Sequence, residues 1–168
     1  MAHLPAMQYA EVQPVLRGTP AIGCVVMVIA VIAWAFFLAQ VVSGIPVGNR
    51  PAPDMVVWVI WAAFGIAFPA VCALMRLEVR VTDDRLEFRY FPLHPAWRIV
   101  PLDEVRAVES TSYRPIREFG GWGIRFGRRG RAFTVSGTGG VWITLRSGRE
   151  FLLGSRRPDD LADALTRG

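Results

Sequence analysis

The sequence has 168 residues, enough for one domain with an appendage, and 52% of them are hydrophobic. All 19 basic residues are arginine, which excludes a lysine Schiff base and the lysine of a phosphate-binding P-loop. The net charge of +5 lies wholly in residues 76–168, which hold 17 arginines against 12 acidic residues, so the two halves of the chain differ in character.

The first half contains two long apolar segments. Residues 1–20 include three prolines and few charges, which predicts a loosely ordered N-terminal tail. Residues 21–42 and 55–75 carry no charge, and as helices each reaches roughly 30 Å, the thickness of a bilayer core. We expect two transmembrane helices. Two alternatives remain open: a buried helical hairpin, and a signal peptide cleaved near residue 43.

The spacing of the two segments predicts how they are oriented. The loop between them is short and rich in Gly and Pro, so the helices should form an antiparallel hairpin over residues 21–76. Arginines flank the hairpin at Arg17 and, beyond its second helix, from Arg76 onward, whereas the loop holds only Arg50. By the positive-inside rule, we expect a multi-pass protein of the inner membrane with both termini in the cytoplasm.

A β-hairpin should open the second half, residues 77–168. Apolar and charged residues alternate on both sides of Asp83 and Asp84, which is typical of two half-buried antiparallel strands. One register sets apolar residues opposite each other and opposite charges opposite each other. The predicted pairs are Leu77 with Tyr90, Glu78 with Arg89, Val79 with Phe88, Arg80 with Glu87, and Val81 with Leu86.

Further short strands follow this hairpin. Residues 91–95 should turn, residues 97–100 should form a strand stopped by Pro101, and residues 105–111 another, before an irregular stretch over 112–120. The alternation after residue 121 predicts a meander. Its last turn should place Gly148 in the left-handed region, so that Ile143 faces Phe151 and Val141 faces Leu153.

A helix should end the chain. Pro158 suits its first turn, Asp159 and Asp160 complement the positive end of the dipole, and Arg167 lies at the other end. The order of about seven strands and one helix is similar to the bacterial pleckstrin-homology-like domain, which in many proteins follows two transmembrane helices. This resemblance implies a membrane-anchored α+β protein: a transmembrane hairpin, then a partly open β-barrel capped by the C-terminal helix.

One basic cluster is a candidate site. Arg125, Arg128, Arg129 and Arg131 are separated by glycines and could contact anionic lipid headgroups, each contributing roughly 1 kcal/mol. A solvated turn is the alternative interpretation. Phosphoinositide-binding relatives use basic residues in the loop joining their first two strands. Here that loop is acidic at Asp83 and Asp84, so that function is not carried over.

The sequence favours binding over catalysis. No nucleophile elbow or metal-ligand spacing is present, both cysteines lie in apolar segments, and there are two histidines, so we expect no enzyme activity, metal or cofactor. Interleaved acidic residues argue against nucleic acid. Our first hypothesis is an interaction or assembly module for a membrane protein partner, with self-association as a further expectation. The alternative is a module that binds anionic lipid through residues 125–131.

Overall fold

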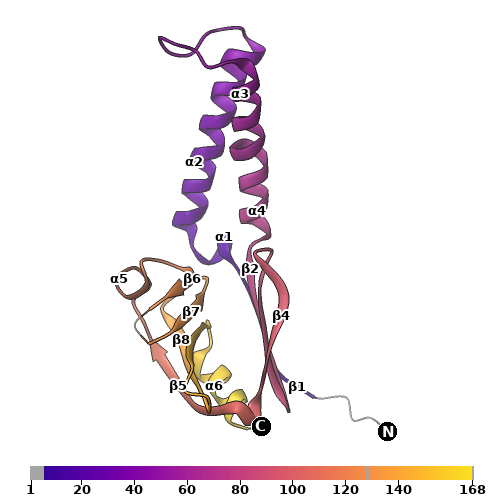
Figure 1. Ribbon diagram of the computed structural model, residues 1–168, viewed down its shortest axis with the longest axis vertical. Coiled ribbons are helices and arrows are strands. Elements are labelled where there is room, and N and C mark those ends of the chain that lie inside the picture. Colours follow the sequence, from indigo (N-terminus) through magenta and orange to yellow (C-terminus); the bar gives the residue numbers. More distant parts are fainter. Residues whose placement is uncertain (1–5, 128, 168) are drawn as a thin grey trace. The chain divides into compact units, whose positions relative to one another are not determined.

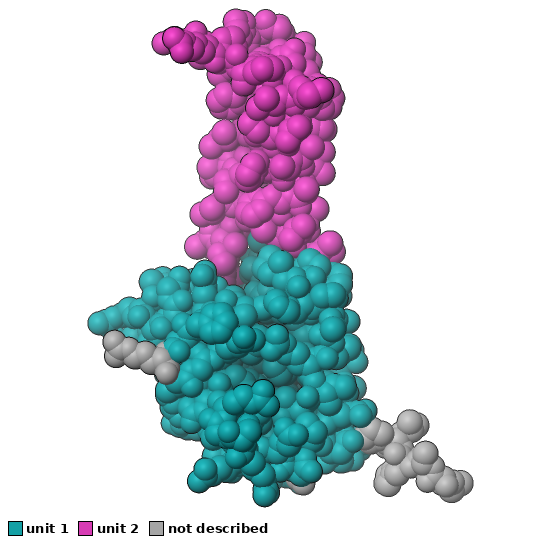
Figure 2. All heavy atoms as spheres, in the orientation of Figure 1, with its two compact units in different colours: residues 1–18, 75–168 teal, residues 19–74 magenta. Residues whose placement is uncertain are grey.

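The computed structural model describes residues 6–127 and 129–167 (Figure 1). The chain divides into two compact units, one of residues 19–74 and one that combines the N-terminal segment up to Gly18 with residues 75–168 (Figure 2). The first unit is a helical hairpin, and the second is a domain of two β-sheets and short helices. The hairpin is therefore an insertion in the sequence of the β-domain rather than a segment that precedes it.

The hairpin consists of two helices long and apolar enough to cross a membrane, Pro20–Val42 and Asp54–Leu74. The sequence predicted them at about 21–42 and 55–75. The first contains α2 and a π-helical stretch, and the second contains α3, a π-helical stretch and α4. Their bounds are Pro20–Phe37, Leu38–Val42, Asp54–Ile60, Trp61–Ala67 and Phe68–Leu74.

Aromatic side chains join the two helices. Phe37 stacks on Trp61 with ring centroids 4.5 Å apart, and the rings of Phe37 and Trp58 form a T-shaped pair with centroids 4.7 Å apart. Trp34 meets Trp61 at 5.2 Å, and its indole N–H donates to the carbonyl of Gly65 at 3.2 Å. Such pairs add to the hairpin about 0.5–1.5 kcal/mol each beyond their burial.

The first sheet has four antiparallel strands in the order β1-β2-β3-β4. Strand β1 lies within residues 1–20, for which the sequence predicted a loosely ordered tail; that prediction is wrong for residues 7–14. Pro14 is opposite Arg76, and the Val15 N–H donates to the Met75 carbonyl at 2.9 Å. The strands are β1 Met7–Pro14, β2 Arg76–Thr82, β3 Arg85–Phe91 and β4 His94–Pro101.

The predicted register of the β2–β3 hairpin is confirmed. Leu77 is opposite Tyr90, Val79 is opposite Phe88, and the charged pairs lie on the other face as expected. The turn before β4 is shorter than predicted, since His94 and Pro95 already belong to that strand.

The second sheet has five strands in the order β5-β8-β9-β7-β6. The predicted pairing of Ile143 with Phe151 and of Val141 with Leu153 is confirmed, and Gly148 has a φ of +79°. The strands are β5 Val105–Ser112, β6 Gly123–Phe126, β7 Arg131–Thr134, β8 Gly139–Leu145 and β9 Glu150–Gly154.

The sheet is not the predicted meander. Strand β7 pairs in parallel with β9, and β8 pairs instead with β5 and β9. Gly130 permits this order, because a Cβ there would lie 2.1 Å from the carbonyl oxygen of Glu150. The stretch 112–120 also differs from the prediction, since Pro115–Phe119 forms the short helix α5.

The core of the β-domain lies between the two sheets. Phe88 of the first sheet contacts Phe133 and Phe151 of the second, with ring centroids 5.0 and 5.5 Å apart. Helix α6, Pro158–Thr166, confirms the predicted C-terminal helix and buries Leu161. The architecture is α+β, with nine strands in the described residues rather than about seven, and the two sheets do not close into a barrel.

Candidate binding cleft

The predicted arginine cluster does not form a single basic patch. Arg128 lies outside the described residues. Arg125 is opposite Ala132 in the β6–β7 pair, and Arg131 is opposite Phe126. Because neighbouring residues of a strand point to opposite faces, Arg125 and Arg131 project away from each other.

Arg129 is neutralised by acidic residues. Its guanidinium lies 3.1 Å from the Glu150 carboxylate and 3.5 Å from that of Glu109, and its carbon lies 4.7 Å from the centre of the Trp142 ring. Half of its side chain is exposed, so these pairs contribute little stability, but they reduce the charge available to an external anion.

A cleft of about 680 Å³ lies where β4 of the first sheet faces the second sheet. Three phenylalanines, each at most 9% exposed, form its floor: Phe88, Phe133 and Phe151. Four arginines and two glutamates line it, so it carries a positive charge. These are Arg98, Arg129, Arg131, Arg149, Glu104 and Glu150.

Three of these arginines have no carboxylate within ion-pair distance among the described residues. Arg98 lies over the ring of Phe133 at 5.0 Å, and Arg131 lies over that of Phe126 at 4.8 Å. Arg149 donates to the Ser147 hydroxyl at 3.3 Å. The aromatic contacts hold Arg98 and Arg131 at the cleft without cancelling their charge.

The sequence identified Arg131 but missed Arg98 and Arg149. Arg98 lies between Trp97 and Ile99 in an alternating strand, which places it opposite Phe88 on the inner face of the sheet. A charged residue in an inward-facing position is the signal that could have identified it.

On the outer face of the first sheet, Glu78 lies between two arginines. Its carboxylate accepts hydrogen bonds from Arg76 and Arg89, and Arg89 also lies 4.4 Å from the Trp97 ring. Burial alone would raise the pKa of Glu78, but the two arginines outweigh it and lower the pKa below its usual value.

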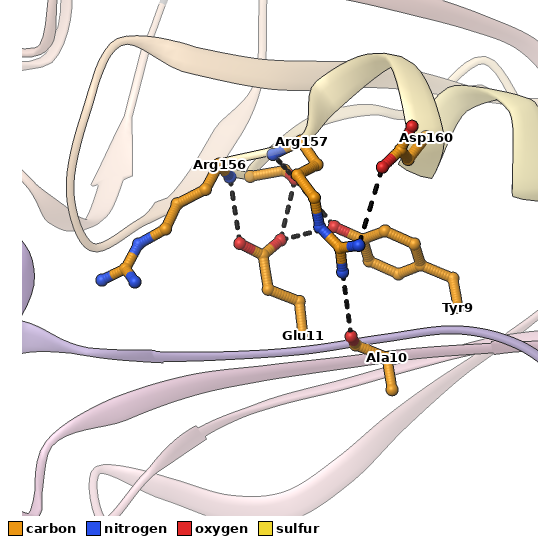
Figure 3. A network of polar contacts seen from close by, with 7 residues as sticks. Tyr9, Ala10, Glu11, Arg156, Arg157 and Asp160 are labelled. Atoms are coloured by element: carbon orange, nitrogen blue, oxygen red, sulfur yellow. Dashed lines mark hydrogen bonds and ion pairs between the residues drawn. The ribbon is translucent and has the colours of Figure 1, made fainter.

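A buried polar network joins β1 to the start of α6 (Figure 3). The Glu11 carboxylate accepts hydrogen bonds from the Tyr9 hydroxyl at 2.6 Å, the Ser155 hydroxyl at 2.8 Å and the Arg156 backbone N–H at 3.0 Å. Burial and the Glu11 carboxylate raise the pKa of Tyr9 to about 12. The guanidinium of Arg157 lies over the Tyr9 ring at 5.0 Å. This network connects the first strand to the end of the chain.

Among the residues that the structure describes, no group of three or more His, Cys, Asp or Glu residues could hold a metal ion.

These features define the class: an α+β protein in which an apolar helical hairpin interrupts a two-sheet domain with an arginine-lined cleft. The model of a family of unknown function, DUF6141, matches residues 6–167, and the chain belongs to this family. A search of curated proteins and a search of solved structures each found no match.

Proposed function

We propose that the protein is a non-catalytic integral protein of the inner membrane whose β-domain acts as a protein-interaction or assembly module at the cytoplasmic face. The observation that carries this proposal is the apolar hairpin inserted between two paired strands of a domain that has an open, positively charged cleft.

The surface of the hairpin supports a membrane environment. In the most apolar 18-residue stretch of each helix, only 17% of the first and 11% of the second is buried inside the protein. Outward-facing residues such as Val31, Met55 and Val59 are at least 60% exposed. A continuous apolar surface of this kind is unfavourable in water and is satisfied by lipid.

The pairing of β1 with β2 supports the proposed topology. Pro14 and Arg76 are opposite each other in one sheet, which supports a topology with both ends of the hairpin on the same side of the membrane. The arginines that flank the hairpin favour the cytoplasmic side.

A pleckstrin-homology-like ancestry is part of the proposal. An antiparallel four-stranded sheet, a second sheet packed against it and a C-terminal helix support it. The parallel pairing of β7 with β9 departs from the simple meander that the resemblance implies.

Anionic lipid headgroups are the second candidate ligand. The exposed side chains of Arg125 and Arg131 favour lipid binding, and the carboxylates around Arg129 weigh against it.

The topology is tested by cysteine labelling. With Cys24 and Cys72 replaced by Ala, Asn49→Cys in the hairpin loop should react with an impermeant maleimide in intact spheroplasts. Ser147→Cys in the β8–β9 turn should react only after permeabilisation. Equal labelling of both positions in intact spheroplasts would contradict the proposed transmembrane topology.

The interaction role is tested by photo-crosslinking in native membranes. A photoreactive residue at Ile99, beside the cleft, should give a crosslinked protein adduct. The same residue at Ile116, 70% exposed on α5, is the matched control and should not. If Ile99 gives no protein adduct, the interaction role is wrong.

A further inference from the structure

We propose that the cleft binds an extended acidic segment of a partner protein, which adds as a fifth strand to the free edge of β4. The inference rests on the proposed function, since it takes the occupant to be a protein. It goes further by stating how the partner binds and which chemistry it presents.

The position of β4 supports strand addition. It is the last strand of its sheet, and among residues 6–127 and 129–167 it pairs only with β3, so its other edge is open to a further strand. Prolines, which remove hydrogen-bond donors, stand at Pro95 and Pro101, and residues 96–100 between them keep theirs. Residues 98–100 line the cleft, so a strand added here would border it.

The charge of the cleft determines the chemistry of the segment. Arg98, Arg131 and Arg149 border the cleft without a carboxylate in ion-pair distance among the described residues. An incoming strand would direct every second side chain into the cleft, and carboxylates at those positions would pair with the arginines.

The other face of the incoming strand should be apolar. Ile99, 56% exposed, is opposite Glu87 in the β3–β4 pair, so its side chain lies on the other face of the strand from Arg98, as does that of the half-buried Trp97. The segment we infer therefore alternates acidic and apolar residues. The open edge of β4 favours a peptide over a lipid, because a lipid headgroup offers no backbone to pair with it.

Fluorescent peptides binding to the full chain in neutral-lipid nanodiscs test the proposal. The probe is a blocked hexapeptide of alternating valine and glutamate, and its control has lysine in place of glutamate. We expect binding of the glutamate peptide, weakened by salt, and at least tenfold weaker binding of the lysine peptide. Successive N–H groups of a strand point to opposite edges, so the peptide has two alternate sets of backbone nitrogens. N-methylation of the set that faces β4 should abolish binding, and N-methylation of the other set should preserve it.

Variants locate the binding site. Arg98→Glu, Arg131→Glu and Arg149→Glu should each weaken binding about tenfold, and Arg98→Gln should do so to a lesser degree. Arg106→Glu, on exposed β5 outside the cleft, should leave it unchanged.

Three results would overturn the inference. The first is equal binding of the glutamate and lysine peptides, and the second is insensitivity of binding to N-methylation. The third is binding of dodecyl phosphate, below its micelle concentration, in place of the peptide, which would identify an anionic lipid. Failure of the peptides together with a protein adduct at Ile99 would overturn strand addition alone. Loss of the adduct as well would overturn the proposed function.

Discussion

The three tyrosines of the chain, Tyr9, Tyr90 and Tyr113, are each at most 6% exposed. Burial raises the pKa of each to about 12. We therefore expect little tyrosinate absorbance at 295 nm up to about pH 11 in the native protein, whereas the chain unfolded in guanidinium should titrate near pH 10.

The same shift has a consequence for stability. Because the folded state holds these protons more tightly than the unfolded state, their contribution is complete below pH 10 and is lost as the pH rises towards 12. A native tyrosine that titrates near pH 10 would contradict the burial described here.

Glu11 offers a test of the network between β1 and α6. Glu11→Ala removes the acceptor of three hydrogen bonds and should lower the free energy of unfolding by about 2–4 kcal/mol. Asp163→Ala, which breaks an exposed ion pair with Arg167, should cost less than about 0.5 kcal/mol. Urea unfolding in detergent micelles measures both, and equal effects would mean that the network is not stabilising.

Glu11 also shows why the sequence did not reveal β1. Tyr9, Glu11 and Gln13 face inward while Val12 is 56% exposed, so the usual pattern of apolar-in and polar-out is inverted. The partners of Glu11 lie some 145 residues away, at Ser155 and Arg156, beyond the reach of local pattern.

Two glycines allow the cost of an unfavourable backbone conformation to be distinguished from the cost of a steric clash. Gly148 has a positive φ but open space around it, so Gly148→Ala should cost about 1–2 kcal/mol. Gly130 adds a clash with the backbone of Glu150, so Gly130→Ala should cost about 3 kcal/mol or more. Urea unfolding of the two variants checks this order, and a smaller loss at Gly130 would contradict the β7–β9 pairing.

The ion pairs of Glu78 with Arg76 and Arg89 should make the stability of the protein depend on pH in the acid range. Because the pKa of Glu78 is lowered on folding, its stabilising contribution is present above pH 4.5 and is lost as the pH falls below that value. Glu78→Gln should therefore lower stability most near neutral pH, with a difference that shrinks in acid. Asp103→Asn, at an exposed site, should show no such convergence.

Elements with a local signal were predictable. The β2–β3 register followed from alternation and charge pairing across a short turn, and α6 followed from Pro158 and its apolar face. The order of the second sheet was not predictable, because the parallel pairing of Arg131 with Phe151 depends on close approach at Gly130. The cleft was not predictable for the same reason, because β4 and β7, which line it, are distant in sequence.

For the whole molecule, the β-domain should fold without its hairpin. The Val15–Met75 hydrogen bond places the two ends of the insertion side by side, so a short Gly-Ser linker in place of residues 19–74 should give a soluble, folded domain. Circular dichroism and the tyrosine titration check this. A second variant that also lacks residues 1–14 should be unstable, and equal stability would show that β1 is dispensable.

The hairpin's place between β1 and β2 also orders events during synthesis. Strand β1 leaves the ribosome first, but its partner follows only after both apolar helices have been made. Completion of the first sheet therefore waits until both helices of the hairpin have been made. In the proposed topology, a helix that fails to insert would leave β1 and β2 on opposite sides of the bilayer. In the proposed membrane protein, pairing of β1 with β2 would thus depend on correct insertion, and a chain with one misplaced helix would lack the sheet that carries the cleft.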